Sequence, residues 1–103
     1  MPETGCKKEK MKHYIIVQFN DNVNFRECVQ PIKELFRSAS GIHGVSHVAV
    51  KESNTDLSNR YDIMIEMELT PCALLAFDNS EIHEQWKMKY GKLIANKIIF
   101  DCD

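Results

Sequence analysis

Residues 12–19 read KHYIIVQF, a run that is rich in β-branched and aromatic side chains. Alternate residues of a strand point to opposite faces of a sheet, so this run predicts a strand with apolar side chains on both faces. The first face would carry His13, Ile15, Val17 and Phe19, and the second would carry Tyr14, Ile16 and Gln18. The fold must therefore provide cover on both sides of this strand.

An amphipathic helix is expected after the polar turn at residues 20–22. Between Phe25 and Ala39 the apolar residues recur at spacings of three and four, which is the period of one helix face. Asn24 and Glu27 have the spacing of a capping box. Pro31 predicts either a kink or a helix that begins only near it. Gly41 then ends the helix.

The remaining elements complete a mixed pattern of strands and helices. We expect strands at 45–50, 61–69 and 93–100, and helices at 71–77 and 81–90. The resulting order β-α-β-β-α-β is that of an α+β, ferredoxin-like fold.

Length and composition favour one soluble domain. The chain has 103 residues, of which 44% are hydrophobic and 27% charged. Residues 1–10 lack apolar periodicity and are expected to form a disordered leader before a domain at 11–103. The net charge of -2 argues against a nucleic-acid partner. No apolar run is long enough to span a bilayer, so we expect a cytoplasmic protein without a membrane partner.

Motifs for cofactors and metals are missing from the sequence. The four cysteines, Cys6, Cys28, Cys72 and Cys102, form no Cys-x-x-Cys pair and are expected to be reduced thiols. His43 and His47 lack the spacing of metal ligands. There is also no glycine-rich phosphate loop and no nucleophile elbow. We therefore expect neither a cofactor nor a metal.

The sheet is expected to have two apolar faces, of which the helices can cover only one. Apolar residues assigned to the second face are Tyr14, Ile16, Val48, Val50, Met64 and Ile99. Leaving such side chains in water forfeits roughly 1.5 to 3 kcal/mol each, so burial against the sheet of a second copy is favoured. The sequence thus predicts a homodimer.

Five stretches occur in a recognisable order. They are residues 12–19, Gly44-Val45, Asn59-Arg60-Tyr61-Asp62, Ser80-x-x-His83-x-x-Trp86-x-x-x-Tyr90-Gly91, and residues 97–101, which read KIIFD. Together, from about residue 11 to residue 101, they resemble the stress-responsive A/B barrel domain family. The resemblance implies a dimeric α/β barrel.

The resemblance also implies site residues. A polyketide cyclase of this family uses a histidine at the start of a helix and a tyrosine six residues earlier. The motif places His83 at the histidine and Phe77 at the tyrosine, so the hydroxyl is missing here. His13 matches a second histidine of the family pattern. The resemblance therefore implies that His83 and His13 are catalytic and that Phe77 contacts substrate.

The residues around His83 support acid–base chemistry on their own. If Ser80 caps the helix, His83 lies in its first turn, where the helix dipole favours neutral imidazole. Neutral imidazole can accept a proton from an acidic carbon or return one. Trp86 and Tyr90 share this helix face and suit a flat apolar ligand, although the same spacing also suits packing in the core.

Arg60, Tyr61 and Asp62 open the third strand. They could form the rim of a pocket, with Tyr61 touching substrate, or an intersubunit salt bridge, which we favour. Three functions stay open. The first is a homodimer of unassigned activity that binds a small, partly apolar molecule, as a cyclase-like lyase. The second is a noncatalytic stress-related or assembly protein. The third is an enzyme like the dimeric-barrel mutarotases or cofactor-free monooxygenases.

Overall fold

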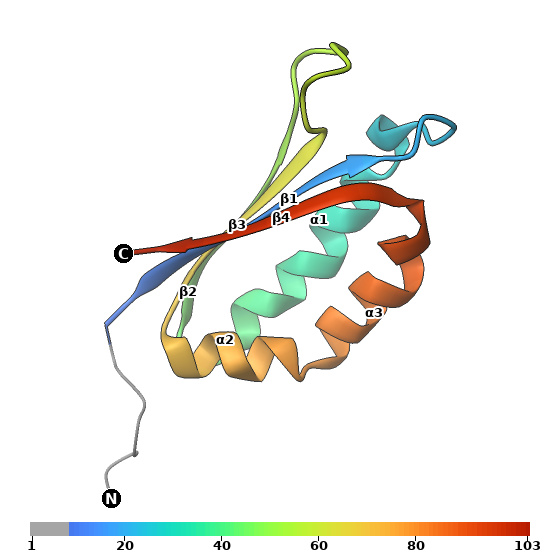
Figure 1. Cartoon of the computed structure of the whole chain (residues 1–103). Coiled ribbons are helices and arrows are strands. Elements are labelled where there is room, and N and C mark those ends of the chain that lie inside the picture. The colour runs from blue at the N-terminus through green and yellow to red at the C-terminus, as the bar shows by residue number, and fades with distance from the viewer. Residues whose placement is uncertain (1–8) are drawn as a thin grey trace, which may run out of the picture.

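The computed structural model describes residues 9–103, and the first eight residues of the expected leader lie outside this range. The described part contains one four-stranded antiparallel sheet with the strand order β2-β3-β1-β4 (Figure 1). Its elements are β1 (Met11–Phe19), α1 (Val29–Arg37), β2 (Val45–Glu52), β3 (Ile63–Leu69), α2 (Pro71–Asp78), α3 (Glu81–Tyr90) and β4 (Ile94–Cys102). The expected ferredoxin-like α+β fold is confirmed, with α2 and α3 together filling the place of its second helix.

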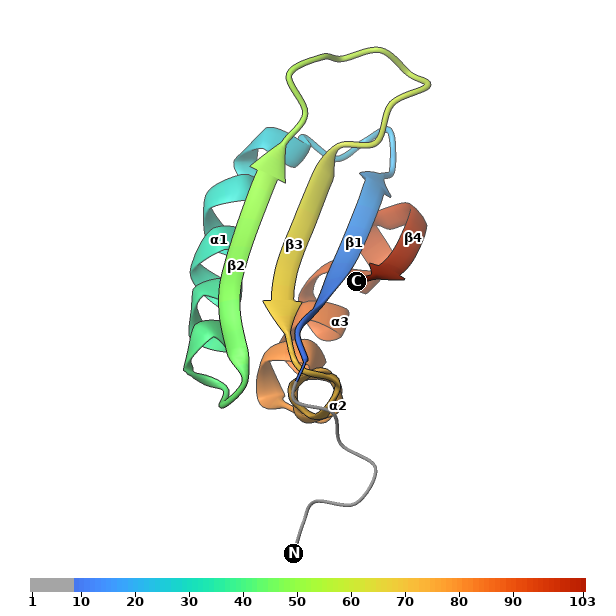
Figure 2. The same cartoon turned by 90° about the vertical axis from the view of Figure 1, so that its left-hand side faces the viewer.

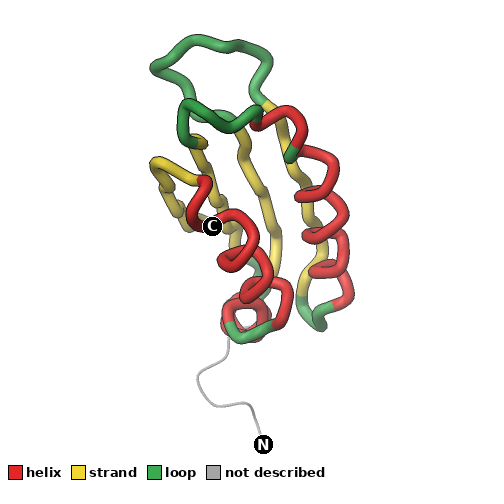
Figure 3. Tube along the Cα trace, turned by 90° about the vertical axis from the view of Figure 1, so that its right-hand side faces the viewer, coloured by secondary structure: helices red, strands yellow, loops and turns green. Residues whose placement is uncertain are grey.

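All three helices lie on one side of the sheet, as Figures 2 and 3 show from opposite directions. The odd-numbered residues of β1 and β3 point toward them and, except for the half-buried Met11, are buried. The largest fully buried side chains of the core are Phe36, Phe77, Ile32, Ile63, Ile65, Met67, Leu69 and Val17. The predicted alternation of β1 and β3 is therefore correct.

The opposite face of the sheet, which we call the open face, is covered by no described element. Tyr14, Ile16 and Met64 lie on it and are half-buried. On the neighbouring edge strand β4, Phe100 is 56% exposed and its ring centroid lies 6.3 Å from that of Tyr14. An apolar stripe thus crosses β3, β1 and β4 on the open face.

Three residues assigned to this face lie on the other side. Val48 and Val50 pair with Met67 and Ile65, and Ile99 pairs with Ile15, so all three share the helix face. The assignment was wrong because the register of β2 shifts between Val45 and His47, and that of β4 shifts opposite Gln18 and Phe19. An irregularity of one residue reverses which side chains face the core.

Helix starts follow local chemistry. α1 begins at Val29, so Pro31 lies in its first turn, where a missing N–H costs little. The expected capping box is wrong, because the Asn24 side chain accepts from the Arg26 N–H and caps only the short 3-10 turn Phe25–Glu27. Thr70 caps α2 by accepting from the Ala73 N–H at 3.1 Å.

Cys28 and Cys102 are free thiols, as expected. Cys72 instead takes part in a disulfide, so the expectation of reduced thiols is wrong for it. Disulfides depend on proximity in space, which sequence spacing does not reveal. Among the described helices, none has the length and apolar character needed to cross a membrane.

Candidate functional site

His83 lies in the first turn of α3, at the junction with α2. The Ser80 hydroxyl accepts from the His83 backbone N–H at 3.3 Å and donates to the Phe77 carbonyl at 2.6 Å. One side chain therefore caps α3 and ties it to the last turn of α2. The predicted cap and the position of His83 in the first turn are both confirmed.

The His83 ring packs against an apolar neighbour. Its centroid lies 5.2 Å from that of Phe77, in an edge-to-face arrangement. Its Nδ1 is buried and has no hydrogen-bond partner among the described residues. A buried polar atom without a partner costs free energy, and such atoms are usually satisfied by a water or a ligand. This nitrogen therefore lacks the partner that a water or a ligand usually supplies to a buried polar atom.

Beyond Phe77, the aromatic rings continue into the core. Phe36 contacts Phe77 at 5.8 Å and Trp86 at 5.2 Å, and Trp86 contacts Tyr90 at 5.4 Å between centroids. Phe77 is 0% exposed and Trp86 is 2% exposed. The core-packing interpretation of Trp86 and Tyr90 fits these positions, and a role of the three aromatic residues in binding stays a prediction.

His13 lies on the helix face of β1 and is 5% exposed. Its Nδ1 is 2.5 Å from Oδ1 of Asp101, the residue directly opposite it on β4. A carboxylate accepts, so Nδ1 carries the proton in this contact and Asp101 orients the ring. Asp101 was not expected as the partner of His13 from the sequence. Its signal was the KIIFD stretch, but the pairing depends on the register between β1 and β4.

The two histidines lie toward the same end of the sheet. β1 begins opposite the end of β3, and α2 and the first turn of α3 follow directly from that end (Figure 1). No hydrogen bond or ring contact of the described residues joins His13 to His83.

Tyr61 does not join them. It precedes β3, at the end of the sheet where β1 finishes, since Val17 pairs with Ile63. Its neighbour Asp62 accepts from the Phe19 N–H at 2.8 Å, so this carboxylate is already bonded within the chain. Of Arg60, Tyr61 and Asp62, only Arg60 has a charged group without an oppositely charged partner among the described residues. Arg60 could therefore form the favoured intersubunit salt bridge.

Hollows in the surface lie near some of these residues. His83 is not among the residues that line four of these hollows. One of about 540 Å³ is lined by Met11, Pro71, Asp101 and Cys102, among others. Asp101 therefore connects the buried His13 ring to a hollow at the surface.

Two titratable groups respond to burial near α1 and α3. Burial raises the pKa of the Cys28 thiol, and the charge of Glu27 adds to this shift. Burial also raises the pKa of the Tyr90 hydroxyl, with a smaller contribution from Cys28. Within residues 9–103, no cluster of three or more His, Cys, Asp or Glu side chains could hold a metal ion.

No protein-family model matches the chain, and no curated protein sequence matches it. Solved structures do resemble it. A dimeric ferredoxin-like protein of unknown function from Thermobifida fusca has a TM-score of 0.76 at 14% identity, over 95% of this chain and 91% of that chain. A DABB family protein with a ferredoxin-like fold from Mesorhizobium loti has a TM-score of 0.69 at 14% identity, over 91% and 95%. A hydroxynitrile lyase from Passiflora edulis has a TM-score of 0.70 at 9% identity, over 92% and 93%. At such identities the likeness shows the fold alone.

Proposed function

We propose that the chain is a homodimeric member of the stress-responsive A/B barrel family that binds a small, partly apolar molecule and transfers protons on it through His83 and His13. The chemistry would be that of a lyase or cyclase. The observation that carries the proposal is the buried Nδ1 of His83, which lies beside Phe77 without a hydrogen-bond partner.

Self-association is supported by the open face. Tyr14, Ile16 and Met64 stay half-buried there, and Phe100 is largely exposed on the adjacent strand. Burying these side chains against a second copy would remove a continuous apolar surface from water. Similar solved proteins are described as dimeric, and one is described as a DABB family protein, which agrees with the resemblance seen in the sequence.

Acid–base chemistry is supported by the different surroundings of the two imidazoles. His13 is oriented by Asp101, which can balance the positive charge that the ring acquires on taking up a proton. His83 has no such partner and lies against an aromatic ring. Two groups of unlike surroundings suit a reaction that removes a proton at one point and returns it at another. A hydroxynitrile lyase with this fold supports lyase chemistry on such a scaffold.

The test replaces His83 by phenylalanine. The new ring keeps the contact with Phe77 but removes the unpaired nitrogen, so we expect the variant to be as stable as the wild type or slightly more stable. In D2O, the wild type should catalyse proton exchange at the carbon next to the carbonyl of acetophenone. The variant should lose at least about 100-fold of this rate, the usual range for general acid–base catalysis.

His47→Gln serves as the control, because His47 is exposed on β2. It should leave both the exchange rate and the melting temperature unchanged. A panel of aromatic and polyketide-like compounds should also raise the melting temperature of the wild type and not that of His83→Phe. If no compound raises it and no exchange is catalysed, the proposal fails.

A noncatalytic assembly protein is the second candidate. It is favoured by the absence of a hydroxyl at Phe77 and by the burial of Trp86 and Tyr90 in the core. In that case His83→Phe should stabilise the protein and change nothing else. The oligomeric state, measured by sedimentation equilibrium, would still be a dimer.

A further inference from the structure

The open face meets the loop that joins β2 to β3 at one end of the sheet. This loop rises beyond the ends of the strands in Figures 1 and 2. A hollow of about 410 Å³ lies between the loop and the strands. It is lined by Ile16, Lys51 and Met64 of the open face and, among others, by residues 53–55 of the loop. A second copy that covers the open face will therefore also cover this hollow.

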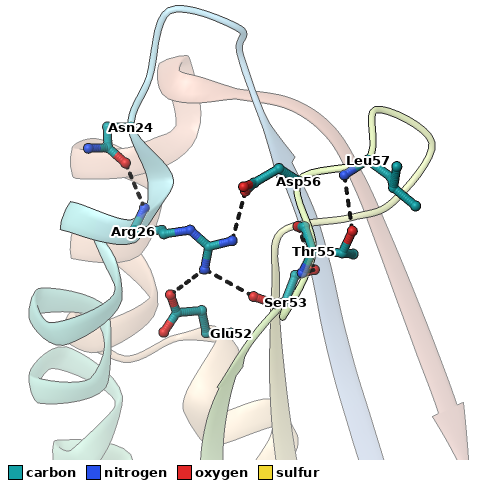
Figure 4. A network of polar contacts seen from close by, with 7 residues as sticks. All are labelled: Asn24, Arg26, Glu52, Ser53, Thr55, Asp56 and Leu57. Atoms are coloured by element: carbon teal, nitrogen blue, oxygen red, sulfur yellow. Dashed lines mark hydrogen bonds and ion pairs between the residues drawn. The ribbon is translucent and has the colours of Figure 1, made fainter.

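The loop is held in place by Arg26. One guanidinium nitrogen lies 2.6 Å from Oε2 of Glu52 and donates to the Ser53 carbonyl at 3.1 Å, and the other lies 2.7 Å from Oδ1 of Asp56 (Figure 4). The near side of the loop is therefore fixed to the turn before α1.

The far side of the loop is fixed to β1. The Gln18 side-chain amide donates to the carbonyls of Ser58 and Arg60 at 3.2 and 3.1 Å. The Asp62 backbone N–H donates to the Val17 carbonyl at 2.8 Å. Since both sides are anchored, the wall of the hollow is preorganised, and a second copy would not have to order it.

The side chains of the open face form three rows across the sheet, because paired residues of neighbouring strands lie side by side. The row next to the loop is apolar apart from Lys51, and the row at the other end pairs an acid with a base. From the loop onward, the first row is Lys51, Met64, Ile16 and Ile98, the second is Ala49, Glu66, Tyr14 and Phe100, and the third contains Glu68 and Lys12. The two ends of the open face thus differ in chemistry.

Two arrangements of a second copy place the sheets face to face with aligned strands. A two-fold axis perpendicular to the strands, centred on the second row, puts Glu66 opposite Glu66 of the second copy and Met64 opposite its Glu68. An axis parallel to the strands instead keeps each row opposite itself and places β1 of the second copy over β3. Met64 then faces Ile16, and Glu68 faces Lys12. Only this arrangement matches apolar side chains with each other and charges of opposite sign with each other.

We infer that a second copy packs on the open face about an axis parallel to the strands, so that its Ile98 fills the hollow and its Lys12 pairs with Glu68. The inference rests on the homodimer of the proposed function and adds which residues meet. With this axis, β4 of the second copy lies over β2, and its Ile98 lies over Lys51, beneath the loop. Ile98 is 46% exposed in the single chain, so it has apolar surface left to bury. Each contact occurs twice, because both copies present the same surface.

The first test reverses the charges of the third row. Lys12→Glu and Glu68→Lys, each studied alone by sedimentation equilibrium, should dimerise at least about 10-fold more weakly than the wild type, because like charges then meet. In an equimolar mixture each carboxylate faces an ammonium of the other variant, so association should recover by at least about 10-fold. Lys33→Glu and Glu34→Lys are the matched control. They make the same charge changes on the exposed side of α1 and should dimerise like the wild type, alone or mixed.

A cross-link provides the second measurement and does not depend on charge. Lys51 and Ile98 lie on opposite edge strands of one sheet, roughly 14 Å apart at the usual strand spacing, which is too far for a disulfide within one chain. The double variant Lys51→Cys/Ile98→Cys should therefore form a covalent dimer under mild oxidation. Each single variant and the wild type, which keep the native thiols, should form much less of it.

The outcomes separate this inference from the dimer on which it rests. If the wild type is dimeric but the mixed variants associate no more tightly than the separate ones, the inferred axis is wrong. A cross-link yield of the double variant no higher than that of the single variants would overturn it as well. A monomeric wild type would overturn the homodimer of the proposed function, and this inference with it.

Discussion

The two faces of the sheet are built from neighbouring residues of the same strands, yet they differ in what covers them. On β3, Ile65 and Met67 point toward the helices and are 0% exposed. Their neighbours Met64 and Glu66 point the other way and are only half-buried. The same strand thus contributes side chains both to the buried core and to the open face, which no described element covers.

This difference separates the free energy of folding from the free energy of binding. The helix face buries large side chains within the chain, so it determines whether the protein folds. The open face gains little until another surface meets it, so it determines what the folded protein binds. Substitutions on alternate residues should therefore affect different measurements.

The largest effect is expected from Ile65→Ala. This change removes buried methyl groups from a packed core and should lower the free energy of unfolding by about 2 to 4 kcal/mol. Met64→Ala, one residue away, should cost about 1 kcal/mol in the same experiment, because Met64 is half-buried. Urea unfolding at a fixed protein concentration compares the two. Equal losses would show that the faces are not energetically distinct.

A charge on the open face should act on assembly. Ile16→Glu should weaken the proposed dimer at least about 100-fold, because a carboxylate without a partner is costly to bury. Gln30→Glu adds the same charge on the exposed side of α1 and should leave the dimer intact. Sedimentation equilibrium distinguishes the two. A dimer that survives Ile16→Glu would mean that copies associate through another surface.

The smallest effect is expected on the pH dependence of stability, through Cys28, which lies directly before α1. The folded protein raises the pKa of Cys28 above its ordinary value of 9.0, chiefly by burial. The contribution to stability is therefore complete below pH 9 and is lost as the pH rises through the folded-state pKa. Wild type should lose more stability than Cys28→Ala above pH 9, as measured by thermal melts. Identical pH profiles would show that burial of this thiol does not matter.

Much of the fold could be predicted from the sequence because β1 and β3 alternate strictly. Both are central strands that pair without a register shift. Their odd-numbered and even-numbered side chains therefore face opposite sides of the sheet, as the alternation predicts. The edge strands β2 and β4 each shift register once, and Val48, Val50 and Ile99 were misplaced for that reason. Bulges leave no strong signal in a single sequence.

The candidate site could be predicted only in part. Ser80 and His83 are local to one helix start, and local capping chemistry sufficed to place them. Asp101 and the separation of Tyr61 from the histidines depend on which strands pair. Such pairing is a property of the whole sheet and is not contained in any one stretch.

The order of the strands also has a consequence for folding. β1 is a central strand, and its partner β4 lies far away in sequence, since His13 and Asp101 are separated by 88 positions. Pairing at such a separation closes a large loop and slows folding. We expect β1, β3 and β2 to assemble on α1 first, leaving one edge of β1 unpaired until β4 arrives. The His13–Asp101 contact would then be among the last to form, and its appearance would report the completion of folding.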